Sequence, residues 1–552
     1  MEALDWLVIG VFFLALIGII VWVVRQKQND SADYFLGGRD ATWLAIGASI
    51  FASNIGSEHL IGLAGAGASS GMAMAHWEIQ GWMILILGWV FVPFYTRSMV
   101  YTMPEFLERR YNPQSRTILS VISLVSYVLT KVAVTVYAGG LVFQQVFGIK
   151  ELWGIDFFWI AAIGLVVLTA LYTIFGGMKS VLYTSVLQTP ILLLGSLIIL
   201  VLGFKELGGW DEMMRVCGAV TVNDYGDTMT NLIRSNDDAN FPWLGALIGS
   251  AIIGFWYWCT DQFIVQRVLS GKNEMEARRG TIFGAYLKLL PVFLFLIPGM
   301  IAFALHQKYI GAGGEGFLPM LANGTANADA AFPTLVAKLL PAGVKGLVVC
   351  GILAALMSSL ASLFNSSAML FTIDFYKRFK PETPEKKLVG IGQIATIVIV
   401  VLGILWIPIM RSVGDVLYTY LQDVQSVLAP GIAAAFLLGI CWKRTSAQGG
   451  MWGLISGMVI GLTRLGAKVY YSNAGEVADS TFKYLFYDMN WLFFCGWMFL
   501  FCIIVVIVVS LATEAPTAEK IQGLVFGTAT KEQKAATRAS WNHWDIIHTV
   551  II

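Results

Sequence analysis

Two polar segments interrupt long apolar runs in the first part of the chain. They are Ser53-Asn-Ile-Gly-Ser-Glu-His59 and His76-Trp-Glu-Ile-Gln80. Polar side chains are costly inside a membrane and by default mark a functional site. An unwound stretch beside a cavity explains the first segment, because its free carbonyls can coordinate a cation or a solute. A helix-packing seam of small residues is the alternative, but it does not account for Glu58 beside His59. For the second segment the alternative is interfacial residues that face lipid headgroups.

An aromatic run and a lysine inside an apolar run add further binding chemistry. The run Phe255-Trp-Tyr-Trp-Cys-Thr-Asp-Gln262 offers flat ring faces to the C–H faces of a sugar, and its Tyr and Trp add polar groups. An interfacial aromatic belt is the alternative, yet a belt does not explain a run placed mid-span and followed by Asp-Gln. Lys288 lies too deep to reach the surface easily, so it needs a carboxylate or several acceptors.

The serine hydroxyls of Ser358 and Ser359 are suitable ligands for Na⁺. Serines in a helix also bond back to an earlier carbonyl and bend the helix, which is the simpler alternative. A later polar stretch, Tyr418-Thr-Tyr-Leu-Gln-Asp423, is followed by Gln425. The run Gly67-Ala-Ser-Ser-Gly71 matches a nucleophile motif but lacks the strand-turn-helix context that the motif needs. We therefore predict that the protein is not an enzyme.

The composition indicates a multi-pass membrane protein. Of 552 residues, 57% are hydrophobic and 13% are charged, and the mean hydropathy is +0.72. A soluble domain has about 45–50% apolar and about 25% charged residues. Lys and Arg number 36 against 35 Asp and Glu, so no basic surface favours nucleic acid. The six cysteines are scattered without metal or disulfide spacing.

Thirteen segments are long and apolar enough to be expected to cross a membrane as helices. A fourteenth begins at 545–552 and is cut short by the end of the chain. Arg25 and Lys27 follow the first segment, and Lys and Arg gather in alternate loops, which predicts an external N-terminus. The expected spans are 4–24, 42–67, 72–96, 117–148, 153–175, 181–203, 242–269, 280–306, 343–373, 388–409, 413–441, 447–471 and 485–511.

Two sets of five spans divide the chain into a predicted pair of repeats. The first set occupies 42–203 and the second 242–441, and because five is odd the second set runs inverted relative to the first. The rest consists of an N-terminal flanking helix and cytoplasmic loop (1–41), an external loop (204–241), and C-terminal flanking helices with a cytoplasmic loop (442–552).

Several motifs, taken in order, resemble those of the sodium/solute symporter family and its sodium/glucose cotransporter branch. The resemblance runs from about residue 30 to the end of the chain and depends on the order and spacing of many motifs. The motifs are Asp33-Tyr-Phe-Leu-Gly-Gly-Arg39, Phe51-Ala-Ser-Asn-Ile-Gly-Ser-Glu-His59, Tyr172-Thr-Ile-Phe-Gly-Gly-Met-Lys-Ser180, Trp256-Tyr-Trp-Cys-Thr-Asp-Gln262, Tyr286-Leu-Lys-Leu289, Met357-Ser-Ser-Leu-Ala-Ser362 and Arg538-Ala-Ser-Trp-Asn-His-Trp-Asp545.

The resemblance implies an all-α, LeuT-type core of five plus five inverted helices with flanking helices, about fourteen in all. It also implies a sodium site and a sugar site. Gly254 departs from the pattern, because relatives place a polar side chain there. Ser185 also departs, because relatives often carry an acidic residue at that position, so one Na⁺ per solute is expected. The implied sodium ligands are the carbonyls of Ala52, Ile55 and Ala355 and the hydroxyls of Ser358 and Ser359; the implied sugar contacts are Asn54, His59, Glu78, Tyr257, Trp258, Lys288 and Gln422; the implied gates are Trp77, Tyr257 and Tyr418.

The implied function is Na⁺-driven uptake of a hexose, glucose or galactose, across the plasma membrane by alternating access. Na⁺, the sugar and the lipid bilayer are the expected partners. Two alternatives stay open. One is the same mechanism acting on myo-inositol, sialate or another small solute, although a carboxylated solute would need a free cation and Glu78 is expected to offset Lys288. The other is a sugar-gated sensor or channel with the same fold.

Overall fold

The computed structural model describes the chain except residues 27, 29, 57, 322–323, 414–416 and 474–477, and except the side chains of 129–130, 409–413, 417–423 and 473. Among the described residues nearly all regular structure is helical. The exceptions are a two-stranded antiparallel hairpin, β1 (Glu151–Leu152) and β2 (Ile155–Asp156), and a few isolated bridges.

In the first half of the chain, the described residues form twelve α-helices. They are α1 Ala3–Val24, α2 Ser31–Leu36, α3 Trp43–Asn54, α4 Ala64–Ser70, α5 Ala75–Glu78, α6 Gly81–Ile86, α7 Val92–Ser98, α8 Met103–Arg110, α9 Pro113–Ser126, α10 Ala133–Phe147, α11 Phe157–Leu207 and α12 Trp210–Gly218.

The second half continues with α13 to α27. They are α13 Trp243–Phe255, α14 Gln262–Leu269, α15 Glu274–Lys288, α16 Ile297–Gly311, α17 Ala331–Leu339, α18 Val344–Met369, α19 Lys377–Phe379, α20 Glu385–Val413, α21 Leu417–Cys441, α22 Ala447–Asn473, α23 Thr481–Lys483, α24 Trp491–Ala512, α25 Ala518–Ile521, α26 Lys531–Ala539 and α27 His543–Ile551.

Short helical stretches of tighter or wider pitch join several of these helices. The ones that matter for the site are η2 Glu58–Leu63 and η6 Trp256–Thr260. The others are η1 Gly37–Arg39, η3 Gly71–Met74, η4 Leu87–Phe91, η5 Tyr127–Val132, η7 Val292–Leu296, η8 Ala328–Ala330, η9 Leu370–Tyr376 and η10 Tyr484–Asp488.

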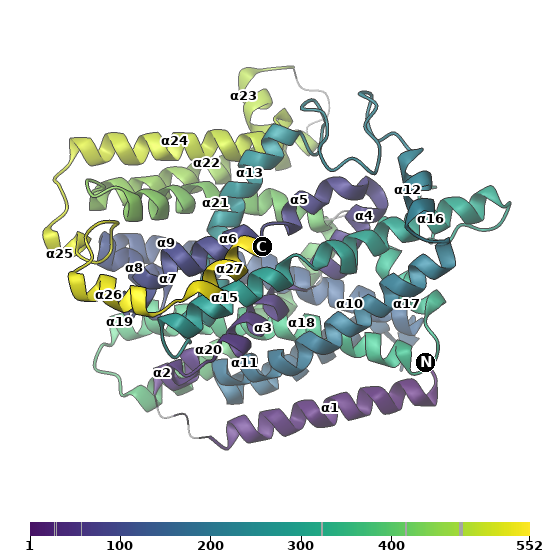
Figure 1. Ribbon diagram of the computed structural model, residues 1–552, viewed down its shortest axis with the longest axis horizontal. Coiled ribbons are helices and arrows are strands. Elements are labelled where there is room, and N and C mark those ends of the chain that lie inside the picture. Colours follow the sequence, from purple (N-terminus) through teal and green to yellow (C-terminus); the bar gives the residue numbers. More distant parts are fainter. Residues whose placement is uncertain (27, 29, 57, 322–323, 414–416, 474–477) are drawn as a thin grey trace.

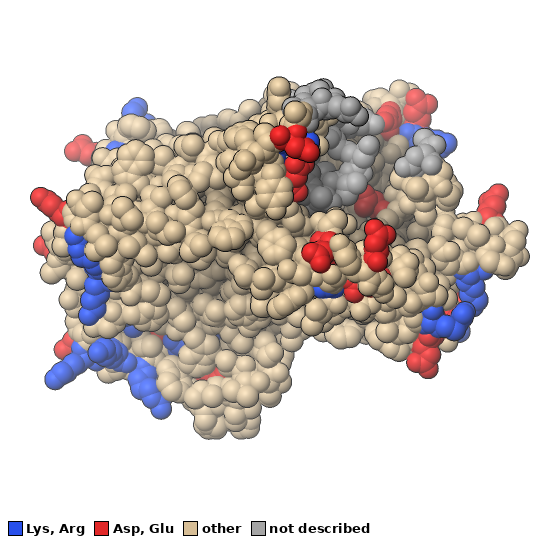
Figure 2. Space-filling model, turned by 90° about the horizontal axis from the view of Figure 1, so that it is seen from above, with Lys and Arg blue, Asp and Glu red and all other residues tan. Residues whose placement is uncertain are grey.

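The long helices run roughly side by side, as expected for a bundle that spans a membrane (Figure 1). The N-terminus and α12 lie toward one end of the bundle, and α25 and α26 lie at the other (Figure 1). Figure 2 shows a face on which charged side chains gather toward the two ends, beside a broad uncharged band. This arrangement fits the predicted orientation, in which the external loop 204–241 and the cytoplasmic segment 512–544 lie on opposite sides.

Within the described part of the chain, nine stretches are long and apolar enough to cross a membrane. Their burial differs widely: 22% of the most apolar window is buried in α1, against 89% in the span that contains α18. α1 therefore lies at the periphery of the bundle (Figure 1) and α18 lies in its core. Two predicted spans, 117–148 and 447–471, are helical but are not among the nine. The second of them carries Arg464 and Lys468, which lower its hydropathy.

The predicted spans 153–175 and 181–203 form a single assigned helix, α11, that is interrupted at Gly177. Gly177 has φ 53° and ψ −149°, a conformation that favours glycine. A Cβ atom there would lie 2.4 Å from the carbonyl oxygen of Tyr34. The backbone of α2 therefore packs directly against the break, which separates the two predicted spans without a loop.

Two predicted spans are broken at their polar segments. α3 ends at Asn54, Ile55 is extended (φ −78°, ψ 108°), and the helix resumes at Glu58 as η2. Later in the chain, η6 is followed by Asp261, which is also extended (φ −76°, ψ 126°) and caps α14 by accepting from the Phe263 backbone N–H. Both breaks free backbone groups in the interior, the first of them at the segment where the sequence predicts an unwound stretch, and they position the candidate site.

Candidate solute and sodium sites

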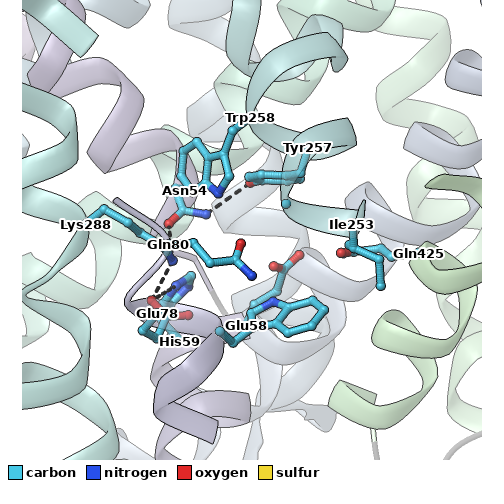
Figure 3. A pocket seen from close by; sticks show the side chains of 12 residues that line it. Asn54, Glu58, His59, Glu78, Gln80, Ile253, Tyr257, Trp258, Lys288 and Gln425 are labelled. Atoms are coloured by element: carbon cyan, nitrogen blue, oxygen red, sulfur yellow. Dashed lines mark hydrogen bonds and ion pairs between the residues drawn. The ribbon is translucent and has the colours of Figure 1, made fainter. Parts of the chain in front are cut away.

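One small cavity gathers polar and aromatic side chains from both broken helices and from three further helices (Figure 3). Six of the seven predicted solute contacts line it, and so does the predicted gate Trp77. The side chains of Gln422 and Tyr418 lie outside the described residues, so their roles stay predictions. The lining residues are Asn54, Glu58, His59, Trp77, Glu78, Gln80, Ile253, Gly254, Tyr257, Trp258, Lys288 and Gln425.

A buried ion pair holds one wall of the cavity. Lys288 Nζ donates to Glu78 Oε2 at 2.6 Å and to Asn54 Oδ1 at 3.2 Å. His59 Nε2 lies 3.3 Å from the same Glu78 oxygen. The Lys288 and Glu78 side chains are 4% and 2% exposed, so each charge depends on the other. The ammonium group is therefore compensated by the protein itself and does not favour a carboxylated solute.

Two aromatic rings from η6 form a second wall. The Tyr257 hydroxyl accepts from Asn54 Nδ2 at 3.1 Å, and the Tyr257 and Trp258 rings meet edge to face at 5.0 Å. Lys131 Nζ lies 4.8 Å from the centre of the Tyr257 ring and donates to Asp261 Oδ2 at 2.6 Å. The broken helix thus presents aromatic surface and a tyrosine hydroxyl to the cavity. The Lys131–Asp261 ion pair packs against the Tyr257 ring.

The structure adds five lining residues that the predicted site did not include. They are Glu58, Gln80, Ile253, Gly254 and Gln425. Gln425 and Ile253 lie across the cavity from Lys288 and Glu78 (Figure 3). Glu58, Gln80 and Gln425 all belong to the polar runs of the sequence, so they could have been predicted from those runs. Ile253 and Gly254 carry no such signal.

Gln80 accounts for the departure at Gly254. A Cβ atom on Gly254 would lie 2.4 Å from Gln80 Oε1, so the amide fills the space that a larger side chain would take. Gln80 Nε2 donates to the Ser250 carbonyl at 3.0 Å, which holds the amide in place. The polar group missing at position 254 is thus supplied by a neighbouring helix.

Two of the five predicted sodium ligands, Ser359 and Ile55, meet where α18 crosses the break after α3. Ser359 Oγ lies 3.1 Å from the carbonyl oxygens of both Ser53 and Ile55. A Cβ atom on Gly56 would lie 2.8 Å from Ser359 Oγ, so the glycine permits this close approach. Ala52 and Ala355 are each 1% exposed on the two facing helices. Buried carbonyl and hydroxyl oxygens of this kind replace the hydration shell of a hard monovalent cation.

The solute cavity is closed in this structure. It offers about 30 Å³, which is room for a water molecule or two and not for a sugar ring. On α14, after the break at Asp261, Gln266 Nε2 donates to the Phe35 carbonyl at 2.7 Å and Ser366 donates to Gln266 Oε1 at 2.8 Å. The ring of Trp77, which lines the cavity, packs 5.6 Å from that of Trp491 on α24. A solute therefore enters only when the surrounding helices move.

The comparisons with known proteins agree with this arrangement. The family model "Sodium:solute symporter family" matches residues 34–457. The mouse (Mus musculus) Sodium/myo-inositol cotransporter 2 is 37% identical over 542 residues, covering 96% of this chain and 80% of that relative. The zebrafish (Danio rerio) Sodium/glucose cotransporter 4 is 35% identical over 560 residues, covering 98% and 84%.

A solved structure supports the fold. A Na⁺-coupled sialic acid symporter in its substrate-bound outward-open state superposes with a TM-score of 0.74 at 21% identity, over 94% of this chain and 99% of that one. The protein therefore has the fold of a LeuT-like symporter. It is a multi-pass membrane transporter and not an enzyme. With the family model covering most of its length, the chain belongs to the sodium:solute symporter family.

Proposed function

We propose that the protein couples inward flow of Na⁺ to uptake of a small, neutral, polyhydroxylated ring, a hexose or an inositol, across the plasma membrane. The observation that carries this proposal is the set of side chains around the cavity. Asn54, Glu78 and Lys288 supply acceptors and donors while their charges cancel within the protein. Hydroxyl groups both donate and accept, so a mixed set of donors and acceptors suits them.

The aromatic wall favours a ring. Tyr257 and Trp258 present apolar faces next to polar groups, and a sugar or cyclitol likewise combines an apolar C–H face with a polar rim. Relatives named for myo-inositol and for glucose both match this chain over most of its length. Both solutes have this chemistry.

Coupling would follow from the shared helix break. Ile55 belongs to the proposed sodium site, and Asn54 belongs to the proposed solute site. An ion bound at one residue fixes the conformation of the next, so Na⁺ stabilises the state in which the solute site is complete. In this proposal Na⁺ is a transported ion and not a cofactor. Residues 42–203 and 242–441 form the two inverted repeats, which rock against each other during transport. With the flanking helices, the protein has about fourteen membrane-spanning helices.

Two other functions predict different chemistry. A carboxylated solute such as sialate would need a cation that is free, whereas Lys288 donates to Glu78 at 2.6 Å. A sugar-gated sensor or channel would not need a sodium site beside the solute site. This geometry therefore favours a symporter of a neutral polyol.

The test is uptake by purified protein in proteoliposomes. Radiolabelled glucose, galactose, myo-inositol and sialate are each supplied with an inward Na⁺ gradient and, as a control, with a K⁺ gradient. We expect Na⁺-dependent accumulation of at least one neutral polyol and none of sialate. Accumulation of sialate alone, or equal uptake in Na⁺ and K⁺, would overturn the proposal.

A further inference from the structure

Glu58 is a cavity-lining carboxylate to which none of the described residues donates a hydrogen bond. It stands at the start of η2, and it is not one of the solute contacts that the sequence predicts. In Figure 3 the dashed lines join other residues of the cavity, and none of them reaches Glu58. An acceptor placed in this way calls for a donor from outside the protein.

Three of the donors that line the cavity already have partners within the protein. Asn54 Nδ2 donates to Tyr257, Gln80 Nε2 donates to the Ser250 carbonyl, and Lys288 donates to both Asn54 and Glu78. None of these bonds uses the oxygens of Glu58. The cavity therefore offers a solute an acceptor that the described residues leave without a donor.

We propose that Glu58 gives the site a preference for a cyclitol, a carbocycle with a hydroxyl on every ring carbon, over a pyranose hexose. This inference rests on the proposed function. An ionised carboxylate only accepts hydrogen bonds. His59, Lys131 and Lys288 attract its negative charge, and Glu78 repels it. A hydroxyl that donates to it forms a charge-assisted bond, which is stronger than a bond between neutral groups.

The two solute classes differ at one ring position. A pyranose has an ether oxygen in its ring, which accepts and cannot donate, and the carbon next to it carries a flexible hydroxymethyl arm. A cyclitol has a donor hydroxyl at every ring position. Whichever way the cyclitol ring is turned against the aromatic wall, one of its hydroxyls can therefore donate to Glu58. An ether oxygen that faces a carboxylate leaves two acceptors opposed in a buried site, which is unfavourable.

The experiment compares binding of two solutes to the full chain and two variants. Solute-induced shifts of the melting temperature, measured in detergent with saturating Na⁺, give the dissociation constants of myo-inositol and glucose. The variant Glu58→Gln replaces one acceptor by a donor, and Glu315→Gln, at an exposed position between α16 and α17, is the matched control. We expect the wild type and the control to prefer myo-inositol by about tenfold or more. In Glu58→Gln we expect that ratio to fall about tenfold.

A solute-side series keeps the inference testable if Glu58→Gln folds poorly. Inositols with a single hydroxyl replaced by fluorine lose a donor at one known position. We expect at least one of them to bind the wild type about tenfold more weakly than myo-inositol, and Glu58→Asp, which keeps the carboxylate, to show the same pattern.

Three outcomes would overturn the role of Glu58. They are an unchanged myo-inositol to glucose ratio in Glu58→Gln, a wild type that prefers glucose, and equal binding of all fluorinated inositols. If no neutral polyol shifts the melting temperature of any variant, the proposed function fails instead, so the two failures are distinguishable.

Discussion

The hydroxyl groups of Ser358 on α18 and Ser185 on α11 lie 3.4 Å apart. Both residues are buried, at 1% and 0% exposed. Ser185 Oγ also donates to the Val181 carbonyl at 2.6 Å and lies 3.5 Å from Ser49 Oγ. The hydroxyl of the proposed sodium ligand Ser358 is thus linked to a group of neutral oxygens, at the position where the family resemblance leads us to expect an acid.

This neutral surrounding predicts one Na⁺ per solute. A second ion without a carboxylate would be buried among dipoles alone, which is costly. Reversal potentials in proteoliposomes with defined Na⁺ and solute gradients measure the ratio directly. We expect a ratio of one Na⁺ per solute molecule in the wild type and an increase toward two in Ser185→Asp. A wild-type ratio of two would show that another group replaces the missing carboxylate.

Ser359 is predicted to determine the affinity for Na⁺ more than that for the solute. Its hydroxyl oxygen lies 3.1 Å from the carbonyls of Ser53 and Ile55, so Ser359→Ala removes one oxygen ligand from the proposed site. We expect the Na⁺ concentration for half-maximal uptake to rise about tenfold, which corresponds to about 1.4 kcal/mol. Ser367→Ala, on the same helix and also buried, is the control. It should change neither the Na⁺ concentration for half-maximal uptake nor the affinity for the solute. A solute affinity that falls while the Na⁺ dependence stays constant would argue against the assignment.

The Lys288–Glu78 pair predicts a pattern of stability among variants. Removing either partner leaves an uncompensated buried charge, which costs about 3–5 kcal/mol. Lys288→Met and Glu78→Gln should therefore each lower the melting temperature in detergent, and the double variant should lower it less than the sum. All three should lose solute binding. Additive effects on the melting temperature would mean that the two side chains are not coupled, despite the 2.6 Å contact.

Tyr257 is predicted to act through both its ring and its hydroxyl. Tyr257→Phe keeps the ring but loses the bond to Asn54 Nδ2, so we expect solute binding to persist and the maximal uptake rate to fall. Tyr257→Leu should lose both, because the flat face is gone. If both variants have the solute affinity and the maximal uptake rate of the wild type, Tyr257 has no role in binding or gating.

Asp329 predicts a pH dependence of stability outside the membrane spans. Burial raises the pKa of this carboxyl to about 6 from its usual 3.8. Because the folded state disfavours the charged form, stability is highest below the unfolded pKa and falls as pH rises through about 6. Asp329→Asn should raise the melting temperature at pH 7.5 and reduce the difference between pH 4.5 and 7.5. Asp224→Asn, at an exposed site, should leave that difference unchanged, and an equal effect of both variants would contradict the assignment.

The membrane class and the positions of both helix breaks could be predicted from the sequence. Polar groups are rare enough in apolar spans that the runs ending at His59 and Gln262 stood out, and the structure breaks both helices there. The kink at Gly177 could not be predicted as a break without a loop. It depends on the Tyr34 backbone, which packs from a distant part of the sequence.

The composition of the site was predictable in part. Lys288 needs a carboxylate at membrane depth, and Glu78 was one of few in reach. The place of Gln80 depends on the absence of a side chain at Gly254 on another helix, which a single sequence does not reveal. The exposure of Glu58 to the cavity likewise depends on how η2 turns after the break, and no periodicity of the sequence specifies that turn.

The central claim is that Na⁺ and a neutral polyol move together in one cycle. The most direct measurement uses proteoliposomes with equal Na⁺ and equal labelled polyol on both sides, and an inside-negative potential set by a K⁺ gradient and valinomycin. The potential supplies about 2.3 kcal/mol per charge per 100 mV. We predict that the polyol accumulates inside above its external concentration when Na⁺ is present and does not accumulate when choline replaces Na⁺. A polyol concentration that stays equal on both sides in Na⁺, with the potential maintained, would contradict the account.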